Sequence, residues 1–248
     1  MKAIILAAGK GKRLGKLTRS IPKPMLKIEN KPILEHNIEW LKNNGIKDIY
    51  INLHHLPDLI KDYFKDGKNW GVKIHYSYEP NLLGTAGGVR KIAEDFWIKT
   101  TQNSNKCCSN HESKNPFVVI YGDNLFKYDL KEIKNFHECK KAIATIALYK
   151  KNNVDQSGIV ILDNEEKIIK FIEKPKSYEI VSHLVNTGLY ILEPKVLNYI
   201  PPKTEVDFGK DVFPAMIHEK ENIFGIICKG NLRAVDTPEL YKQVITMN

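Results

Sequence analysis

Short apolar runs alternate with segments of helical spacing in the first half of the chain. The runs predict four strands, each as long as a buried strand of a parallel sheet: Lys2–Ala8, Asp48–Leu53, Val72–Tyr78 and Phe117–Tyr121. The clearest helix is predicted over Ile33–Asn44, where the apolar residues share one face and Gly45 follows the last turn. Such alternation is typical of βαβ units that wind into a mostly parallel sheet.

The pattern changes after about residue 142. It predicts closely spaced strands over Ala142–Leu148, Gly158–Leu162, Ile168–Glu173 and Leu184–Leu192, and helices over Phe208–Lys220 and Pro238–Thr246. These strands indicate a smaller, more antiparallel lobe that supplies its own half of a cleft. We therefore expect one α/β domain over residues 1–248, with halves at about 1–140 and 141–248 and a polar, mobile surface loop over 100–115.

Composition excludes several classes of protein. The 248 residues, 42% of them apolar, suffice for an ordinary core. No apolar stretch approaches the roughly 18 residues that span a bilayer, and Ala3–Ala8 is too short for a signal peptide, so the cytoplasm is expected. The four cysteines form no CxxC pair and are expected to be free thiols. The net charge of +9 favours anionic partners, but without a basic and aromatic cluster nucleic acid is not expected. Whether identical chains assemble into a homo-oligomer stays open.

The segment after the first strand indicates phosphate chemistry. In AAGKGKRLGKLTRSIPKP, three glycines stand among five Lys or Arg residues between Lys10 and Arg19. Backbone N–H groups of such a loop can approach phosphate oxygens while the cations neutralise them. Both a P-loop and the dinucleotide fingerprint require a glycine where this chain has Leu14, so neither an ATPase nor a dehydrogenase is favoured.

The longer segment LAAGKGKRLGKLTRSIPKPMLKIENKPILEHNIEWL resembles the N-terminal signature of the sugar-phosphate nucleotidyltransferases, and the order of later motifs agrees from residue 2 to about 243. The resemblance implies a Rossmann-like nucleotide-diphospho-sugar transferase fold. In this fold a mixed, mostly parallel sheet is flanked by helices, the first half binds the nucleotide, and a small antiparallel lobe binds the sugar. It also implies that a sugar 1-phosphate attacks the α-phosphorus of a nucleoside triphosphate, which gives a nucleotide-sugar and pyrophosphate.

The resemblance assigns nucleotide binding to Leu6, Ala8, Gly9, Gly11, Glu79, Gly84 and Thr85. It makes Arg13 and Lys23 catalytic, with Arg13 on the leaving pyrophosphate and Lys23 on the α-phosphate. Positioned cations suit a transition state that spreads negative charge. Lys12 departs from the family, which usually has a small hydroxyl residue at this position.

The base is expected at EPNLLGTAGG, which follows the third strand. Gly84 permits a close approach of the backbone, and the small residues after it predict a helix N-terminus that faces the cleft. For Glu79 a purely structural role in this strand-to-helix turn is an equal alternative.

Asp123 follows the apolar strand FVVIY, at the carboxyl edge of the sheet where α/β sites lie. The resemblance makes Asp123 a magnesium ligand with Asp236 as its partner, since Mg²⁺ typically takes one or two protein carboxylates. A helix N-cap is the alternative role for Asp236. Ala234 and Thr237 stand where the family usually has an aromatic residue and a glycine near this aspartate.

The resemblance assigns the sugar phosphate to Gly158, Glu173, Lys174 and Asn186. A carboxylate and an amide suit sugar hydroxyls, and an ammonium suits a phosphate. Asp207 and Asp211 are also candidates to lie near this group in space. A helix N-cap with an acidic first turn explains both residues without a function.

The segment around Glu79 most resembles enzymes that make GDP-mannose, which favours a GTP-dependent, mannose-1-phosphate-type guanylyltransferase. The alternatives are a uridylyl- or thymidylyltransferase acting on glucose 1-phosphate or an amino-sugar phosphate, and a catalytically silent regulatory subunit of the same fold. The enzyme is favoured because the main cationic, acidic and amide positions of the family are present together: Arg13, Lys23, Asp123, Lys174 and Asn186.

Overall fold

The computed structural model describes residues 1–98, 115–230 and 232–246 of the chain. The loop predicted over residues 100–115 falls outside the described residues except for its last residue, and so do Cys107 and Cys108. Cys139 and Cys228 are free thiols, as predicted.

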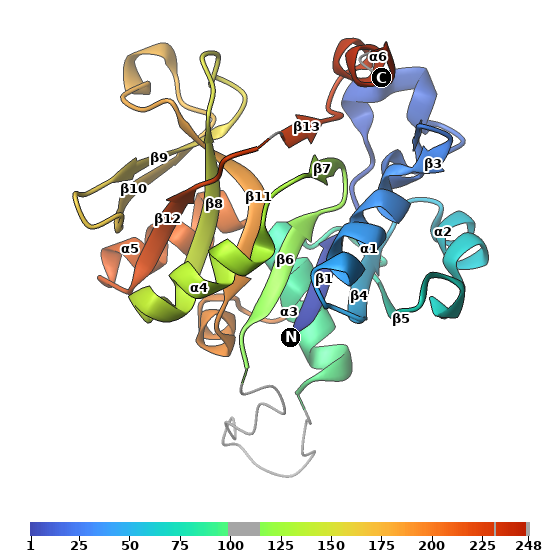
Figure 1. Cartoon of the computed structure of the whole chain (residues 1–248), viewed down its shortest axis with the longest axis horizontal. Coiled ribbons are helices and arrows are strands. Elements are labelled where there is room, and N and C mark those ends of the chain that lie inside the picture. Colours follow the sequence, from blue (N-terminus) through green and yellow to red (C-terminus); the bar gives the residue numbers. More distant parts are fainter. Residues whose placement is uncertain (99–114, 231, 247–248) are drawn as a thin grey trace.

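A nine-stranded mixed sheet forms the centre of the molecule (Figure 1). Its parallel part consists, in spatial order, of β6 (Phe117–Tyr121), β1 (Lys2–Leu6), β4 (Asp48–Leu53) and β5 (Lys73–Tyr78). These are the four strands predicted for the first half. Strand β1 ends at Leu6 rather than Ala8 because the Ala7 N–H donates to Oδ1 of Asn52, at 2.7 Å, and not to a neighbouring strand.

The second half of the chain extends the same sheet with mainly antiparallel strands. These are β8 (Ala144–Lys150), β9 (Gly158–Leu162), β10 (Ile168–Glu173), β11 (Leu184–Leu192) and β12 (Ile223–Ile227), the last of which was not predicted. Strand β11 pairs with β8 along most of its length, with a register shift between Asn186 and Tyr190. On its other side it pairs with β6 through its last residues and with β9 at Val185. The predicted fold class, a mixed sheet flanked by helices with an antiparallel part, is confirmed.

Helices cover both faces of the sheet and complete two apolar cores (Figure 1). Side chains alternate along β1, so Ile4 joins the core under α3 (Gly84–Phe96) and α5 (Phe213–His218). Ala3 and Ile5 join the opposite core under α1 (Ile33–Asn43) and α4 (Leu130–Lys140). Burial of each fully buried aliphatic side chain stabilises the folded state by about 1.5–3 kcal/mol. The two cores therefore fix the positions of the strands whose ends form the cleft.

Small elements at the carboxyl edge of the sheet bring two distant parts of the chain together. Strand β7 (Asn124–Phe126) pairs with β13 (Leu232–Ala234). Asp123 directly precedes β7, and Asp236 lies two residues after the end of β13. Helix α6 (Pro238–Thr246) packs against the 3₁₀ segment Lys12–Thr18. The N-terminal glycine-rich loop and the end of the chain therefore meet at one place.

The described residues also form the helix α2 (Pro57–Phe64), the two-residue strands β2 (Lys27–Ile28) and β3 (Lys31–Pro32), and several short 3₁₀ segments. The helix predicted over Phe208–Lys220 is interrupted, because a π-helical turn over Phe208–Val212 precedes α5. Among the described residues, every helix is too short or too polar to cross a membrane.

Candidate active site

Three adjoining pockets lie at the carboxyl ends of β1 and β6. We name them after one residue each: the Glu79 pocket of about 320 Å³, the Lys23 pocket of about 240 Å³ and the Glu173 pocket of about 230 Å³. Asp123 lines all three, and Arg13 and Asp236 line both the Lys23 and the Glu173 pockets. Every residue predicted for the site lines at least one of these pockets, so the structure brings the whole predicted set together.

The Glu79 pocket contains the residues predicted to bind the nucleotide, except Gly11, which lines the Lys23 pocket. They come from the ends of β1 and β5 and from the start of α3: Leu6, Ala8, Gly9, Glu79, Gly84 and Thr85. The lining of the Glu79 pocket is more apolar than that of the Glu173 pocket. A flat heterocycle fits such a lining, because ligand pockets bury apolar surface and use a few polar groups for orientation.

Glu79 is fully buried, and its carboxylate is held by two donors. Asn52 Nδ2 donates to Oε1 at 2.7 Å, and the Leu83 N–H donates to Oε2 at 3.1 Å. Burial raises the pKa of Glu79, although these two hydrogen bonds oppose the rise. Because Asn52 also accepts from Ala7, this buried network ties the loop after β1 to the turn before α3. The structural role left open for Glu79 is therefore present, whether or not it also contacts a base.

The start of α3 faces the cleft in part: Gly84 and Thr85 line the Glu79 pocket, whereas the N–H groups of the next two residues point to the 204–208 segment. The Ala86 and Gly87 N–H groups donate to the carbonyl of Val206, at 2.9 and 3.1 Å, and Val206 N–H donates to Leu83 O at 2.9 Å. Gly84 has φ +73°, and a Cβ there would lie 2.4 Å from Val206 O. The glycine is thus required for contact with the 204–208 segment.

Gly87→Ala should destabilise the protein by about 1–3 kcal/mol through this contact. A Cβ on Gly87 would lie 2.6 Å from the backbone oxygen of Thr204, which cannot move without separating α3 from the 204–208 segment. Helix propensity alone favours alanine by about 1 kcal/mol, so a net loss reports the steric effect. Urea unfolding measures it. The control is Lys91→Ala on the same helix, which loses only a partly exposed pair with Asp95. A more stable Gly87→Ala protein would contradict the proposed contact.

The Lys23 pocket is built on the glycine-rich loop. Gly11 adopts the left-handed conformation with φ +61°, and its carbonyl accepts hydrogen bonds from Leu14 N–H and Thr18 Oγ1, both at 2.9 Å. A Cβ on Gly11 would lie 2.9 Å from the Thr18 side chain, so only glycine fits this turn. The turn directs Lys12 and Arg13 into the same pocket as Lys23, as expected of a site for a polyphosphate.

Lys23 contacts both carboxylates predicted to bind metal. Its Nζ lies 2.5 Å from Oδ2 of Asp123 and 2.6 Å from Oδ1 of Asp236, and Arg13 lies 3.2 Å from the same Asp236 oxygen. Burial lowers the pKa of Lys23, but the two carboxylates outweigh it and raise the pKa above its usual value. Burial raises the pKa of Asp236, and the charges of Lys23 and Arg13 reverse this and lower it. Lys23 and Asp236 are therefore charged at neutral pH.

The two carboxylates fit a magnesium ion. Their oxygens converge on one point, which Lys23 Nζ occupies, and carboxylate oxygens are the hard donors that Mg²⁺ prefers. In the part of the chain that the structure describes, no cluster of three or more metal-binding side chains exists, so substrate and water would supply the other ligands. The cap of α6 is provided by Thr237, whose Oγ1 accepts from Leu240 N–H at 3.3 Å, and Asp236 points to Lys23 instead.

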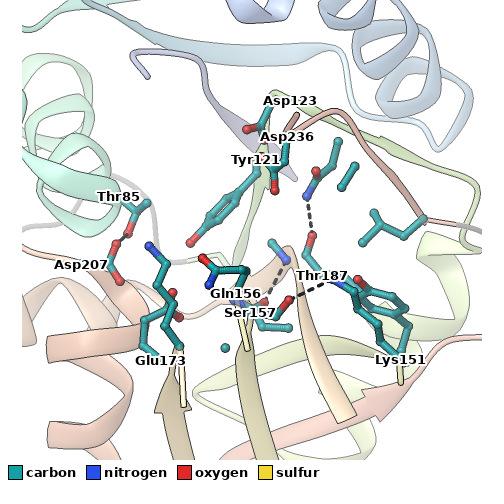
Figure 2. Close-up of a pocket in the computed structure, with 18 of the residues that line it drawn as sticks. Thr85, Tyr121, Asp123, Lys151, Gln156, Ser157, Glu173, Thr187, Asp207 and Asp236 are labelled. Atoms are coloured by element: carbon teal, nitrogen blue, oxygen red, sulfur yellow. Dashed lines mark hydrogen bonds between the residues drawn. The ribbon is translucent and has the colours of Figure 1, made fainter. Parts of the chain in front are cut away.

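The Glu173 pocket contains the residues predicted for the sugar phosphate: Gly158, Glu173, Lys174 and Asn186. Figure 2 shows Glu173 among the side chains that line it. Burial raises the pKa of Glu173, and the neighbouring Asp207 raises it further. The amide of Asn186 is held in place, since its Nδ2 donates to Tyr190 OH at 2.8 Å and its Oδ1 accepts from Gly188 N–H at 2.9 Å. Asn186 thus fixes the turn at Gly188 in addition to any contact with a ligand.

Asp207 caps the π-helical turn, as the sequence indicated, and also lines two pockets. Its Oδ1 accepts from Gly209 N–H at 2.9 Å, and its Oδ2 accepts from Thr85 Oγ1 at 2.8 Å. Thr85, Tyr121 and Asp207 all line both the Glu79 and the Glu173 pockets. The Thr85–Asp207 bond therefore joins the two halves of the chain where these pockets meet.

Several lining residues were not found from the sequence, among them Asn52, Tyr121 and Lys151. Asn52 carried a usable signal, because it is a polar residue inside an apolar strand. Tyr121 ends a strand and reads as an ordinary core aromatic. For Lys151 no sequence signal distinguishes it from the adjacent Lys150, since only the strand geometry decides which of the two faces the cleft.

The fold and site together define an α/β protein whose cleft is suited to a phosphorylated nucleotide. A family model described as nucleotidyl transferase matches residues 2–233. The chain is 41% identical over 228 residues to a UTP–glucose-1-phosphate uridylyltransferase of Synechocystis sp. (strain ATCC 27184 / PCC 6803 / Kazusa), covering 88% of this chain and 55% of that protein. The chain therefore belongs to the nucleotidyl transferase family.

Two further comparisons agree. The chain is 35% identical over 224 residues to a mannose-1-phosphate guanyltransferase of Saccharomyces cerevisiae (strain ATCC 204508 / S288c), covering 89% of this chain and 57% of that protein. A crystal structure of UDP-glucose pyrophosphorylase complexed with UDP-glucose superposes with a TM-score of 0.82 at 19% identity, covering 99% of this chain and 97% of that one, and shows the shared fold. The chain spans little more than half the length of the two relatives found by sequence.

Proposed function

We propose that this chain joins a nucleoside triphosphate to a sugar 1-phosphate and releases pyrophosphate. The observation that carries the proposal is the position of Lys23, whose buried ammonium contacts Asp236 and Asp123, the residue that lines all three pockets. The names of both relatives include a transferase acting on a sugar 1-phosphate, which supports the same chemistry here. A silent regulatory subunit is disfavoured because the cations and carboxylates expected of the enzyme are present, and Lys23 and Arg13 contact the carboxylates.

The three pockets correspond to three parts of the reaction. The Glu79 pocket would hold the base, the Lys23 pocket the triphosphate, and the Glu173 pocket the sugar 1-phosphate. A phosphate oxygen of the sugar 1-phosphate attacks the α-phosphorus, the new P–O bond forms, and the bond to pyrophosphate breaks with its electrons leaving on the pyrophosphate oxygen. Lys23 would neutralise the charge on the α-phosphate and Arg13 that on the pyrophosphate.

Asp123 and Asp236 would hold Mg²⁺, which supplies Lewis-acid stabilisation of charge on phosphate oxygens when bound. Their oxygens already converge, so little rearrangement of the backbone is needed. Lys23 would then pass from the carboxylates to the α-phosphate, a move of one flexible side chain.

For the base, a GTP-dependent reaction with mannose 1-phosphate is the first candidate, because a glutamate stands at the base segment and the yeast relative is named a guanyltransferase. Use of UTP with glucose 1-phosphate is the second candidate, favoured by the 41% identity to the Synechocystis uridylyltransferase. The buried carboxylate of Glu79 is compatible with both, since guanine and uracil each present ring N–H donors.

Pyrophosphate release tests the proposal directly. The purified chain is incubated with Mg²⁺ and each pairing of GTP, UTP, dTTP, CTP or ATP with mannose, glucose, glucosamine or heptose 1-phosphate. Release that requires all three components, with formation of the matching nucleotide-sugar, is the expected result. Ligand-induced thermal stabilisation without release from any pair would instead support a binding subunit.

Lys174→Ala should raise the KM for the sugar 1-phosphate by about tenfold or more, with a smaller change in the KM for the triphosphate. Lys174 lines the Glu173 pocket and is absent from the linings of the other two. Initial rates over a grid of both substrate concentrations give the two constants. Lys176→Ala, which removes an exposed lysine two residues away, is the control. An unchanged KM for the sugar 1-phosphate would remove Lys174 from the site.

A further inference from the structure

Lys151 is a lysine of the cleft that neither the sequence motifs nor the assigned site accounts for. It follows the last residue of β8 and lines the Glu173 pocket together with Arg13 and Asp236. Its Nζ donates to Ser157 Oγ at 3.2 Å, so the side chain extends across the pocket wall (Figure 2). The preceding residue, Lys150, is exposed, whereas Lys151 is half-buried.

The backbone at Lys151 is held rigidly enough to position its ammonium. Lys151 N–H donates to His183 O at 3.0 Å, and the His183 ring nitrogen Nδ1 lies 3.1 Å from Lys151 O. This reciprocal contact continues the pairing of β8 with β11 past the end of the strand. A lysine that emerges from a sheet edge loses less freedom on binding a ligand than one on a free loop.

The charged side chains of the pocket divide into two groups. Figure 2 shows Glu173 and Asp207 on one side, Lys151 on the other, and Ser157 between them. The positive charges that act on Glu173 come from Lys174 and Lys210. The positive charges that act on Asp236 come from Lys23, Arg13 and Lys151, and Lys151 lines the same pocket as Asp236. Lys174 thus acts on the acidic side of the pocket and Lys151 on the side of Asp236.

Attack on the α-phosphorus requires the sugar phosphate to lie beside Lys23, Asp123 and Asp236. The acidic side suits hydroxyl groups, because carboxylates accept their hydrogen bonds and repel a phosphate dianion. We infer that Lys151 binds the phosphate of the sugar 1-phosphate and holds it next to Asp236, with Lys174 serving the sugar side of the same ligand. This inference rests on the proposed function and adds a substrate-binding residue to it.

Lys151→Met tests the inference, since methionine keeps much of the apolar stem and removes the charge. The KM for the sugar 1-phosphate is expected to rise about 10- to 100-fold, while the KM for the triphosphate changes less than about threefold. Lys150→Met, the exposed neighbour, should behave as the unmodified protein, and Lys151→Arg should recover part of the loss. The substrate pair is the one found active in the pyrophosphate assay, and circular dichroism with thermal unfolding checks that each variant is folded.

Ser157→Ala separates binding from a structural role of Lys151. If Lys151 acts only by fixing Ser157, loss of the hydroxyl should reproduce the effect of Lys151→Met, and that result overturns the inference. An unchanged KM for the sugar 1-phosphate in Lys151→Met overturns it as well. If Lys151→Met does not fold, Lys151→Gln, with the same two readouts, decides between the outcomes. Absence of turnover in the unmodified protein would instead refute the proposed function, so the two failures are distinguishable.

Discussion

Replacing Lys23 with methionine is expected to lower turnover by about 10²–10³-fold while the chain stays folded. The side chain of Lys23 is only 8% exposed, and its ammonium is the one that contacts both Asp123 and Asp236 among the described residues. Methionine fills a similar volume but supplies no charge for the α-phosphate. The carboxylates left behind are 29% and 32% exposed, so water and ions can screen them, and stability should fall by less than about 2 kcal/mol.

Pyrophosphate release and thermal unfolding, measured on the same preparation, check this prediction. Lys27→Met is the matched control, because Lys27 is an exposed lysine on the neighbouring strand β2. A second readout concerns the metal. Without Lys23 between them, the two carboxylates should bind Mg²⁺ more readily, so Mg²⁺ alone should raise the melting temperature of Lys23→Met more than that of the unmodified chain. Turnover within tenfold of the unmodified chain would contradict the assignment of Lys23.

Asp123→Asn should reduce turnover by roughly 10²–10³-fold and shift the Mg²⁺ dependence of the remaining activity to higher concentration. Asp123 lines all three pockets, and its carboxylate contacts Lys23. Asparagine keeps the shape but removes the negative charge that attracts the ion. Activity measured over a Mg²⁺ titration shows the shift. Asp129→Asn is the control, because Asp129 caps α4 through Lys131 N–H at 2.9 Å and lies outside the three pockets.

The same titration decides between the two roles considered for Asp236. Asp236→Asn should shift the Mg²⁺ dependence in the same direction as Asp123→Asn, because both carboxylates converge on one point. Thr237→Ala removes the hydrogen bond to Leu240 N–H and should cost about 0.5–2 kcal/mol in stability with little effect on the metal dependence. If the two variants exchange these effects, Asp236 is a cap residue and not a ligand.

The strands were predictable because their hydrophobic pattern is strong and local. The bounds of β4, β6, β9, β10, β11 and α6 match the prediction. Errors occurred where a contact distant in sequence overrides the pattern. Strand β1 ends early because Asn52 takes the Ala7 N–H. In the first turn of α3, Val206 takes the Ala86 and Gly87 N–H groups, which the prediction left free to face the cleft. Asn52 and Val206 both lie far along the chain from the residues that they contact, so the local hydrophobic pattern cannot reveal these contacts.

The site was predictable as a set of residues but not as an arrangement. Motif resemblance identified Lys23, Asp123 and Asp236, which lie up to 213 positions apart in sequence. It contained nothing about Lys23 standing between the two carboxylates, which follows from the pairing of β7 with β13 and the packing of α6 on the glycine-rich loop. Glu79 shows the same limit, because its partner Asn52 lies on another strand.

By itself, the sequence determined the fold class and predicted which residues line the cleft, because these depend on local patterns and on motifs that survive as residue types. Only the tertiary structure decided how those residues act on one another. Burial and neighbouring charge set the protonation of Glu79, Lys23 and Asp236, and the pleat of β8 turns Lys151 rather than Lys150 into the cleft. These quantities depend on distances between segments, which no single stretch of sequence specifies.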